Sequence, residues 1–266
     1  MNRFRTAWLM GAIAFSAAWC GVGCRAVPVS DRYQLLLTGS DYENTVGAEA
    51  YAEYKKKLKV SGDKKYTAAL DRVGPALKAV APANDFQWEF LVFEDNTANA
   101  FCLPGGKVGV YSGLFRYIAN DAELACVVAH EIAHAIARHS GERMSWDALR
   151  SLGTTAVEAT IDEPWVASAY GVGTQFGVML PFSRANESEA DYIGLIMMAQ
   201  AGYDPHAAIT FWKKFGDAGA DSKIAGWLST HPGGAARIAD LEKDMPKAEA
   251  CYRKVARPRG LGVKLQ

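Results

Sequence analysis

Apolar residues recur along most of this chain at the three- and four-residue spacing of helices that are buried on one side. The spacing predicts helices over residues 41–60, 63–80, 120–139, 145–180 and 183–202, and two more that begin at 204 and near 232. Asp63 and Asp204 are favoured caps at helix starts, and Gly202 is favoured just past a helix end. We expect Gly141 to end the helix over 120–139, and the tail after Met245 to be irregular surface chain.

Three short segments between the second and third predicted helices carry the pattern of strands. Residues 86–93 (FQWEFLVF) are aromatic and branched, which favours a strand. Residues 98–103 and 107–111 flank Pro104-Gly105-Gly106, which is typical of a hairpin. The order of helices, three strands and helices predicts an α+β fold, mainly helical, with a small antiparallel β-sheet.

Composition limits the classes of function. The 266 residues are half hydrophobic, which is enough for the core of one large or two small domains. Lys and Arg number 29, as do Asp and Glu, so the formal net charge is zero. Such a chain has no global positive field that would attract nucleic acid, and we expect no nucleic-acid partner.

The first 24 residues have a pattern of their own. Two arginines precede an uncharged, largely apolar run over residues 6–24, as in an export signal. Gly21-Val22-Gly23-Cys24 resembles a bacterial lipobox, although Gly stands where Leu is usual. The resemblance implies cleavage before Cys24 and a lipid on its sulfur; Cys20 follows the bulky Trp19 and is the less suitable acceptor. An uncleaved anchor and simple secretion are the alternatives.

These features divide the chain into a signal peptide, a tether, a folded domain and a tail, over residues 1–23, 24–40, 41–250 and 251–266. Arg25, rather than Asp, follows the candidate lipid acceptor, which implies the outer membrane of a bacterial envelope facing the periplasm. The uncharged stretch 165–182 could span a bilayer by its length. Its polar residues and glycines favour a buried or cleft-lining segment, with membrane insertion as the lesser alternative.

Three cysteines besides Cys24 lie in the rest of the chain, at Cys102, Cys126 and Cys251. The odd count argues against a fully paired disulfide framework, although one disulfide stays open. Cys126 falls within an apolar helical pattern and is interpreted as a small buried hydrophobic residue.

The strongest chemical signal is the sequence His130-Glu131-Ile132-Ala133-His134, an HExxH motif in a predicted buried helix. Residues four apart lie on one face of a helix, so both imidazoles can reach one ion, and zinc suits two nitrogen ligands. Glu131 can contact a water at the open position. A pair of core histidines or a structural metal is the alternative, but burying these groups without partners is costly. His139 falls on the opposite face of a continuous helix and receives no ligand role.

A third ligand has to come from elsewhere in the chain, and the next acidic cluster is Asn186 to Asp191. HExxH followed by SRxxExxxD, which starts at Ser183, resembles the HtpX-like and Oma-like zinc metallopeptidases, relatives of the CAAX prenyl protease. Further matching segments occur in the family's order at Asn99-Ala100-Phe101, Leu103-Pro104-Gly105-Gly106, Tyr111-Ser112-Gly113-Leu114 and Ser229-Thr230-His231-Pro232. The resemblance covers residues 40 to 245 and is greatest to short periplasmic lipoprotein members such as LoiP.

The resemblance implies one Zn²⁺ per chain, with Glu187 as the third ligand and Asp191 as the residue that orients a ligand imidazole. Glu189 lies about 200° round the helix from Glu187 and is interpreted as a solvated surface residue. His231 is open to three interpretations: a turn residue, a group that stabilises the oxyanion, or a fourth zinc ligand in a resting form. Arg237 is expected to pair with an acidic group near the site.

The resemblance also implies a substrate strand. Lys107, Val108, Gly109 and Val110 correspond to the family's edge strand beside the cleft, and an unpaired edge binds extended peptides through main-chain hydrogen bonds. A plain structural hairpin is the alternative.

The expected function is that of a zinc endopeptidase of the bacterial envelope, with Glu131 as the base and unfolded or misassembled proteins as substrates. A latent protease and an inactive zinc-bound chaperone or assembly factor are the alternatives.

Overall fold

The computed structural model describes residues 23–83, 85–160, 180–217, 227, 228, 231 and 234–265. The predicted export signal with Cys20, most of the uncharged stretch 165–182, and Ser229, Thr230 and Pro232 lie outside these residues. Within them, no helix is long and apolar enough to cross a membrane.

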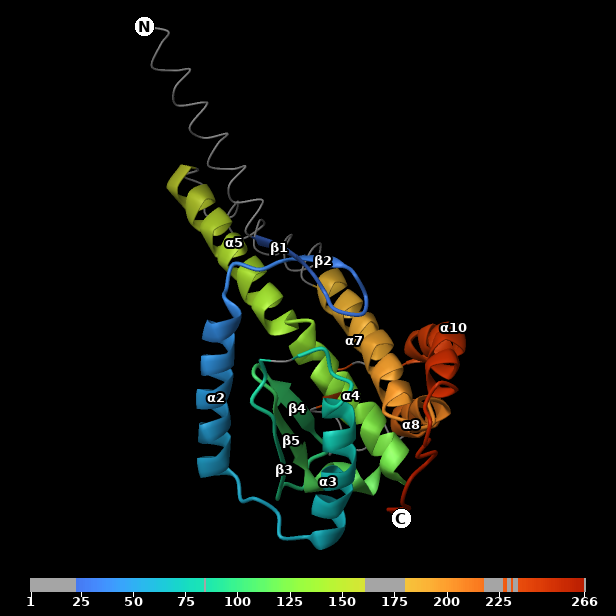
Figure 1. Cartoon of the computed structure of the whole chain (residues 1–266). Helices are drawn as coiled ribbons and strands as arrows, with labels where there is room; N and C mark the ends of the chain where they lie inside the picture. Colours follow the sequence, from blue (N-terminus) through green and yellow to red (C-terminus); the bar gives the residue numbers. More distant parts are fainter. Residues whose placement is uncertain are drawn as a thin grey trace, which may run out of the picture.

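The described chain is mainly helical, with a small sheet and a separate hairpin (Figure 1). Its helices are α2 (Ser40–Lys57), α3 (Lys64–Lys78), α4 (Asp121–Ile136), α5 (His139–Thr160), α7 (Leu180–Gln200), α8 (His206–Asp217) and α10 (Ala235–Tyr252). Its strands are β1 (Cys24–Ala26), β2 (Tyr33–Leu35), β3 (Glu89–Phe93), β4 (Ala100–Leu103) and β5 (Lys107–Tyr111), and a 3₁₀ helix follows at Ser112–Arg116. The predicted α+β class is confirmed.

The expected antiparallel sheet is wrong in one respect, because the sheet is mixed. Its order is β3-β5-β4, with β5 parallel to β3 and antiparallel to β4. The chain reverses direction between β3 and β4 and again at the glycine turn, where Gly105 and Gly106 both have φ of +80°. After the two reversals β5 runs in the same direction as β3, and it lies between β3 and β4.

This order corrects the assignment of the edge strand. β5 is central, so the main-chain groups of Lys107–Val110 pair with strands on both sides and cannot form a free edge. The outer side of β3 is covered by residues 59–61, through Ser61 N to Val92 O at 2.8 Å and Glu94 N to Lys59 O at 2.8 Å. Among the described strands of this three-stranded sheet, the one with an unpaired edge is β4, which packs against α4.

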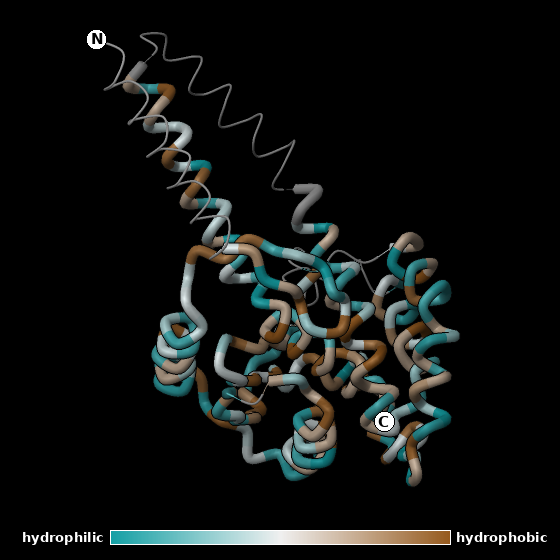
Figure 2. Tube along the Cα trace, turned by 45° about the horizontal axis from the view of Figure 1, so that its top comes forward, coloured by the Kyte–Doolittle hydropathy of each residue, from teal (hydrophilic) through white to brown (hydrophobic). Residues whose placement is uncertain are grey.

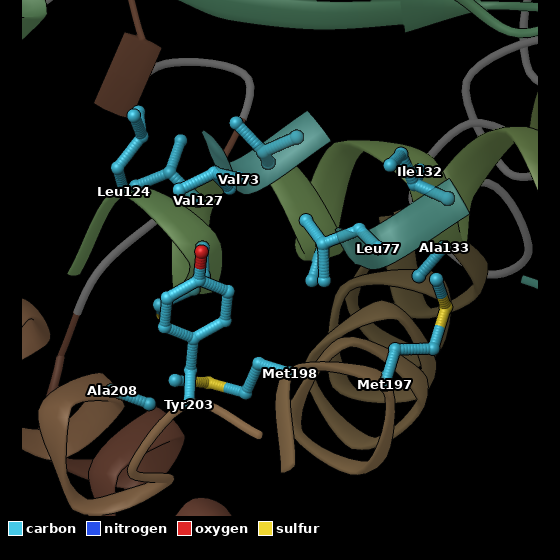
Figure 3. Packing of buried hydrophobic residues seen from close by; sticks show 14 of the residues in the cluster. Val73, Leu77, Leu124, Val127, Ile132, Ala133, Met197, Met198, Tyr203 and Ala208 are labelled. Atoms are coloured by element: carbon cyan, nitrogen blue, oxygen red, sulfur yellow. The ribbon is translucent and has the colours of Figure 1, made fainter. Parts of the chain in front are cut away.

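Helix α4 forms the centre of the core. All of its residues except His134 are buried, and it packs against α3, α7, α8 and β4. Figure 3 shows Val127 and Ile132 of α4 among Val73 and Leu77 of α3, with Met198 of α7 nearby. Figure 2 shows hydrophobic positions in the middle of the body, while hydrophilic positions dominate the outward turns of the outer helices. A helix that is covered on nearly every side in this way forms the interior of a domain rather than its surface.

The end of α4 differs from the expected end. The helix stops at Ile136 rather than near His139, because Arg138 takes a left-handed conformation with φ of +53°. That conformation is costly for a residue with a side chain. Arg138 is held there by Glu43 of α2, through Nε to Oε2 and Nη2 to Oε1, both at 2.9 Å. Gly141 does not end a helix: it lies in α5, where an added Cβ would fall 2.1 Å from Glu43 Oε1.

Residues outside the expected domain also pack onto it. The segment interpreted as a tether forms the antiparallel β1–β2 hairpin, with Val27 and Leu36 buried and β2 against α5. The tail likewise returns to the N-terminal end of α4, where Leu265 is buried and its N–H donates to Ala119 O at 2.7 Å. Cys24, Cys102, Cys126 and Cys251 are free thiols, and Cys126 is buried as expected.

Candidate metal centre

Helix α4 places three residues of the HExxH motif. Asn120 caps this helix by accepting from Glu123 N at 3.0 Å, and ten residues later His130 lies in the buried interior. His130 and Glu131 are 1 % and 4 % exposed. His134, one turn on, directs Nε2 toward Nε2 of His130, at 3.1 Å. The regular helix therefore brings both imidazoles to one point.

Helix α7 supplies the carboxylates because it packs very closely on α4. At Gly194 an added Cβ would lie 3.0 Å from His130 N and 3.1 Å from Ala129 C, so a side chain there would push the helices apart. This close approach places Glu187 and Asp191, two turns and one turn earlier in α7, beside the imidazoles. Glu187 Oε2 is 3.4 Å from His130 Nε2, and Glu187 Oε1 is 3.2 Å from His134 Nε2.

His231 lies in the same group. Its Nδ1 is 3.0 Å from Glu187 Oε2 and 3.2 Å from His130 Nε2, and its Nε2 is 3.6 Å from Glu131 Oε1. The potential ligand atoms of His130, His134, Glu187 and His231 all lie within 4.8 Å of one another. His231 thus belongs to the candidate metal-binding group and is not an isolated turn residue.

The separations fit a tetrahedral zinc ion. Bonds of roughly 2.0–2.1 Å in tetrahedral geometry put neighbouring ligand atoms about 3.3 Å apart. The separations between the ligand atoms of His130, His134 and Glu187 run from 3.1 to 3.4 Å. Two imidazoles and a carboxylate are also ligand types that zinc accepts. Among the described residues, the buried Glu131 Oε1 has no hydrogen-bond partner.

The charges of the group fit a cation as well. Burial lowers the pKa of His134 to about 3, which keeps this imidazole neutral. Burial and Arg237 lower the pKa of His130, but hydrogen bonds to Asp191 and Glu187 outweigh them and raise it to about 9. Burial raises the pKa of Glu187, but hydrogen bonds from the three histidines outweigh it and lower the pKa. The ionised Glu187 thus attracts positive charge to this point.

A second layer holds His130 from behind. Asp191 Oδ1 is 3.0 Å from His130 Nδ1 and accepts from Arg237 Nη2 at 2.6 Å. The expected pairing of Arg237 with an acidic group is therefore confirmed, and its guanidinium lies 3.4 Å from the ring centroid of Trp212. A carboxylate on the far nitrogen fixes the tautomer and orientation of a ligand imidazole.

The sequence places two residues near His134 wrongly: His139 on the opposite face of the helix, and Glu189 in solvent. His139 is 5 % exposed and lies with Nδ1 2.8 Å from His134 Nδ1, because Arg138 breaks the helix and changes the direction of the next residue. Glu189 is 8 % exposed rather than solvated, and its Oε2 is 2.9 Å from His139 Nε2. One signal could have identified Glu189: residues 192–199 are apolar all round, which indicates a helix covered on every side.

Two imidazoles from one helical turn, a carboxylate from a second helix and a buried glutamate beside the first imidazole define the HExxH class of metallopeptidases. The sequence profile of peptidase family M48 matches residues 64–245. The chain belongs to peptidase family M48 and is a metalloendopeptidase.

Curated relatives agree with this family. The chain is 36% identical over 253 residues to the mitochondrial metalloendopeptidase OMA1 of Schizosaccharomyces pombe, covering 92% of this chain and 74% of the relative. It is 35% identical over 205 residues to mitochondrial metalloendopeptidase OMA1 of Arabidopsis thaliana, covering 76% of this chain and 41% of the relative. It is 35% identical over 184 residues to the beta-barrel assembly-enhancing protease of Escherichia coli, covering 65% of this chain and 38% of the relative. The chain thus spans less than half the length of the latter two proteins.

Replacing glycine by alanine should have opposite effects on stability at Gly194, which is in close contact with α4, and at Gly216. Gly194→Ala should lower the melting temperature by about 2–4 °C, because about 1–3 kcal/mol of overpacking exceeds the gain in helix propensity of up to about 1 kcal/mol. Gly216→Ala, in α8, should raise the melting temperature slightly, because no atom of the described residues lies within 4 Å of its added Cβ. Thermal unfolding by circular dichroism measures both, and equal upward shifts would contradict the close-contact argument.

Proposed function

We propose that the chain is a zinc endopeptidase in which His130, His134 and Glu187 hold one Zn²⁺ and Glu131 is the catalytic base. The observation that carries the proposal is the spacing of 3.1 to 3.4 Å between the three ligand atoms. Zinc held there would polarise a peptide carbonyl and lower the pKa of a bound water. The Glu131 carboxylate takes a proton from the attacking water and returns it to the leaving nitrogen. Asp191 keeps the His130 ring in place.

The proposed substrates are unfolded or misassembled proteins that bind as extended chains. Extended binding needs an uncovered strand edge, and β4 at Ala100–Leu103 supplies it in place of the expected Lys107–Val110. Because β4 lies against α4, a peptide on its outer edge would pass beside the HExxH helix. Main-chain pairing selects extended conformation more than sequence, which suits substrates of many kinds. The name of the beta-barrel assembly-enhancing protease supports the envelope as the place of action.

The proposed location is the periplasmic face of a bacterial outer membrane, with a lipid on Cys24. Cys24 is exposed at the start of β1, which leaves its sulfur accessible.

The anchor is tested by expressing the full chain with a radiolabelled fatty acid. Cys24→Ser should abolish labelling, because the acceptor sulfur is gone. Cys20→Ser is the matched control and should label as the parent does. Loss of label in Cys20→Ser alone would show that the anchor was assigned to the wrong cysteine.

The role of Glu131 is tested with Glu131→Gln on an unfolded protein such as casein. The substitution removes the base but leaves the ligands, so cleavage should fall by roughly 100- to 10,000-fold. Zinc content, measured on the same samples, should stay at one ion per chain. Normal cleavage would refute the assignment of the base, and a parent chain without zinc would refute the metal site.

His231 gives the proposal its second form, a latent protease. The Nδ1 of His231 lies at ligand spacing from both Glu187 and His130, which supports a fourth zinc ligand in a resting form. A fourth protein ligand fills the position that water and substrate need in a catalytic site.

His231→Ala should therefore cleave casein faster than the parent, because three zinc ligands remain and the fourth position opens. The initial rate at equal zinc content measures this. A rate lower by roughly 100- to 1000-fold would instead identify His231 as a group that stabilises the oxyanion. If neither form cleaves and both hold zinc, the inactive chaperone becomes the better function.

A further inference from the structure

His134 is held from behind by a buried chain of polar groups that the catalytic proposal does not use. His139 Nδ1 is 2.8 Å from His134 Nδ1, and His139 Nε2 is 2.9 Å from Glu189 Oε2. Glu189 in turn contacts Ser30 and Arg32, which belong to the N-terminal segment. Four residues from three separate parts of the sequence thus converge behind one candidate ligand.

The outer end of this chain of contacts fixes the Glu189 carboxylate. Arg32 donates from Nε to Oε1 at 3.1 Å and from Nη2 to Oε2 at 2.8 Å, and Ser30 Oγ donates to Oε1 at 2.5 Å. Arg32 also donates to both oxygens of Glu142 in α5, at 2.9 and 2.7 Å. The Arg32 guanidinium thus contacts both oxygens of the buried Glu189, which identifies Glu189 as a carboxylate that only accepts hydrogen bonds.

The hydrogen-bond roles then follow one from another. Because Glu189 only accepts, His139 donates to it from Nε2. The other ring nitrogen of a neutral imidazole is an acceptor, so His139 Nδ1 accepts from Nδ1–H of His134. His134 is left with its lone pair on Nε2, the atom that lies 3.1 Å from His130 Nε2 and 3.2 Å from Glu187 Oε1. The contacts thus select the tautomer of His134 that can bind a metal.

We propose that His139 and Glu189 are positioning residues that hold His134 in its Nε2-ligating tautomer, and that Arg32 of the N-terminal segment fixes this relay. The proposal rests on the proposed zinc site. It gives the two histidines of the HExxH motif different supports. Asp191 with Arg237 acts directly on His130, whereas Glu189 with Arg32 acts on His134 through a second imidazole. The N-terminal segment becomes a structural part of the metal centre.

The alternative is that these residues only join α5, α7 and the N-terminal segment. A structural role predicts loss of stability without a specific change at the metal. Zinc affinity and the proton position on His134 separate the two, because neither depends on turnover.

The experiment uses the full-length protein with Glu131→Gln as the parent, which avoids self-cleavage. Zinc affinity is measured by competition with a chromophoric chelator. Glu189→Gln and His139→Phe should weaken zinc binding by roughly 10- to 100-fold. Arg32→Gln should also weaken zinc binding. The matched control is Asp121→Asn. Asp121 lies in α4, as do His130 and His134, and its buried carboxylate accepts two hydrogen bonds from Arg72. This variant should keep the parent affinity.

The proton position is measured by long-range ¹H–¹⁵N correlation on the zinc-loaded parent, where His134 should carry its proton on Nδ1. In Glu189→Gln the His134 signals should broaden or shift, and in Asp121→Asn they should not. If the parent binds zinc and both Glu189→Gln and His139→Phe bind it within twofold of the parent, the relay is refuted while the zinc site stands. If His139→Phe does not fold, Glu189→Gln, which keeps the size of the side chain, decides alone. A parent that binds no zinc refutes the proposed function and the relay with it.

Discussion

The site depends on how closely α7 approaches α4. Gly194 lets the two helices meet backbone to backbone at His130, and one helical periodicity then sets the positions of all the groups that α7 contributes. Glu187 and Asp191, four residues apart on one face, reach the ligand nitrogens and the far nitrogen of His130. Glu189 points away from that face but still faces protein, because the β1–β2 hairpin and the start of α5 cover that side. A wider separation of the helices would therefore move the ligand Glu187 and the supporting carboxylates Asp191 and Glu189 away from the imidazoles together.

Burial makes this arrangement costly and therefore specific. The imidazoles of His130 and His139 and several carboxylates are buried, and an unpaired charge is strongly unfavourable in the interior. Each described carboxylate behind the ligands has an arginine: Asp191 pairs with Arg237, and Glu189 pairs with Arg32. The ligand carboxylate Glu187 faces His130, His134 and His231, and Arg237 Nη1 lies farther off, 3.6 Å from its Oε2. The second layer is thus balanced by the chain itself, and the ligand group is the part that fits a metal.

Local features of the fold could be predicted from the sequence, and features that depend on distant pairing could not. Asp63 caps α3 and Asn120 caps α4 because capping acts over three residues. The central place of β5 depends on its pairing with β3, about 18 residues earlier, and no periodicity encodes which strand lies in the middle. The true end of α4 was missed because Arg138 adopts a left-handed conformation that is held by Glu43, 95 residues away.

The candidate site shows the same division. The HExxH spacing is a property of one helical turn, so His130 and His134 could be paired from the sequence alone, and the resemblance supplied Glu187. The sequence places His139 on the face opposite His134, because the rule of about 100° per residue is applied across Arg138. Helix α4 ends at Ile136, so the rule does not hold there.

The packed N-terminal hairpin connects the two proposals. Cys24 pairs with Leu35 across β1 and β2, and the loop between these strands carries Ser30, whose hydroxyl donates to Glu189, with Arg32 just before β2. A lipid on Cys24 would therefore be attached to a folded hairpin and not to a free tether. The domain would then be held near the bilayer in a restricted orientation, because the hairpin is fixed to α5 and α7 through Arg32 and its contacts with Glu142 and Glu189. Such a protease would meet those substrates that expose extended chain close to the membrane surface. The residues that connect the anchor to the domain would be the same ones that orient His134.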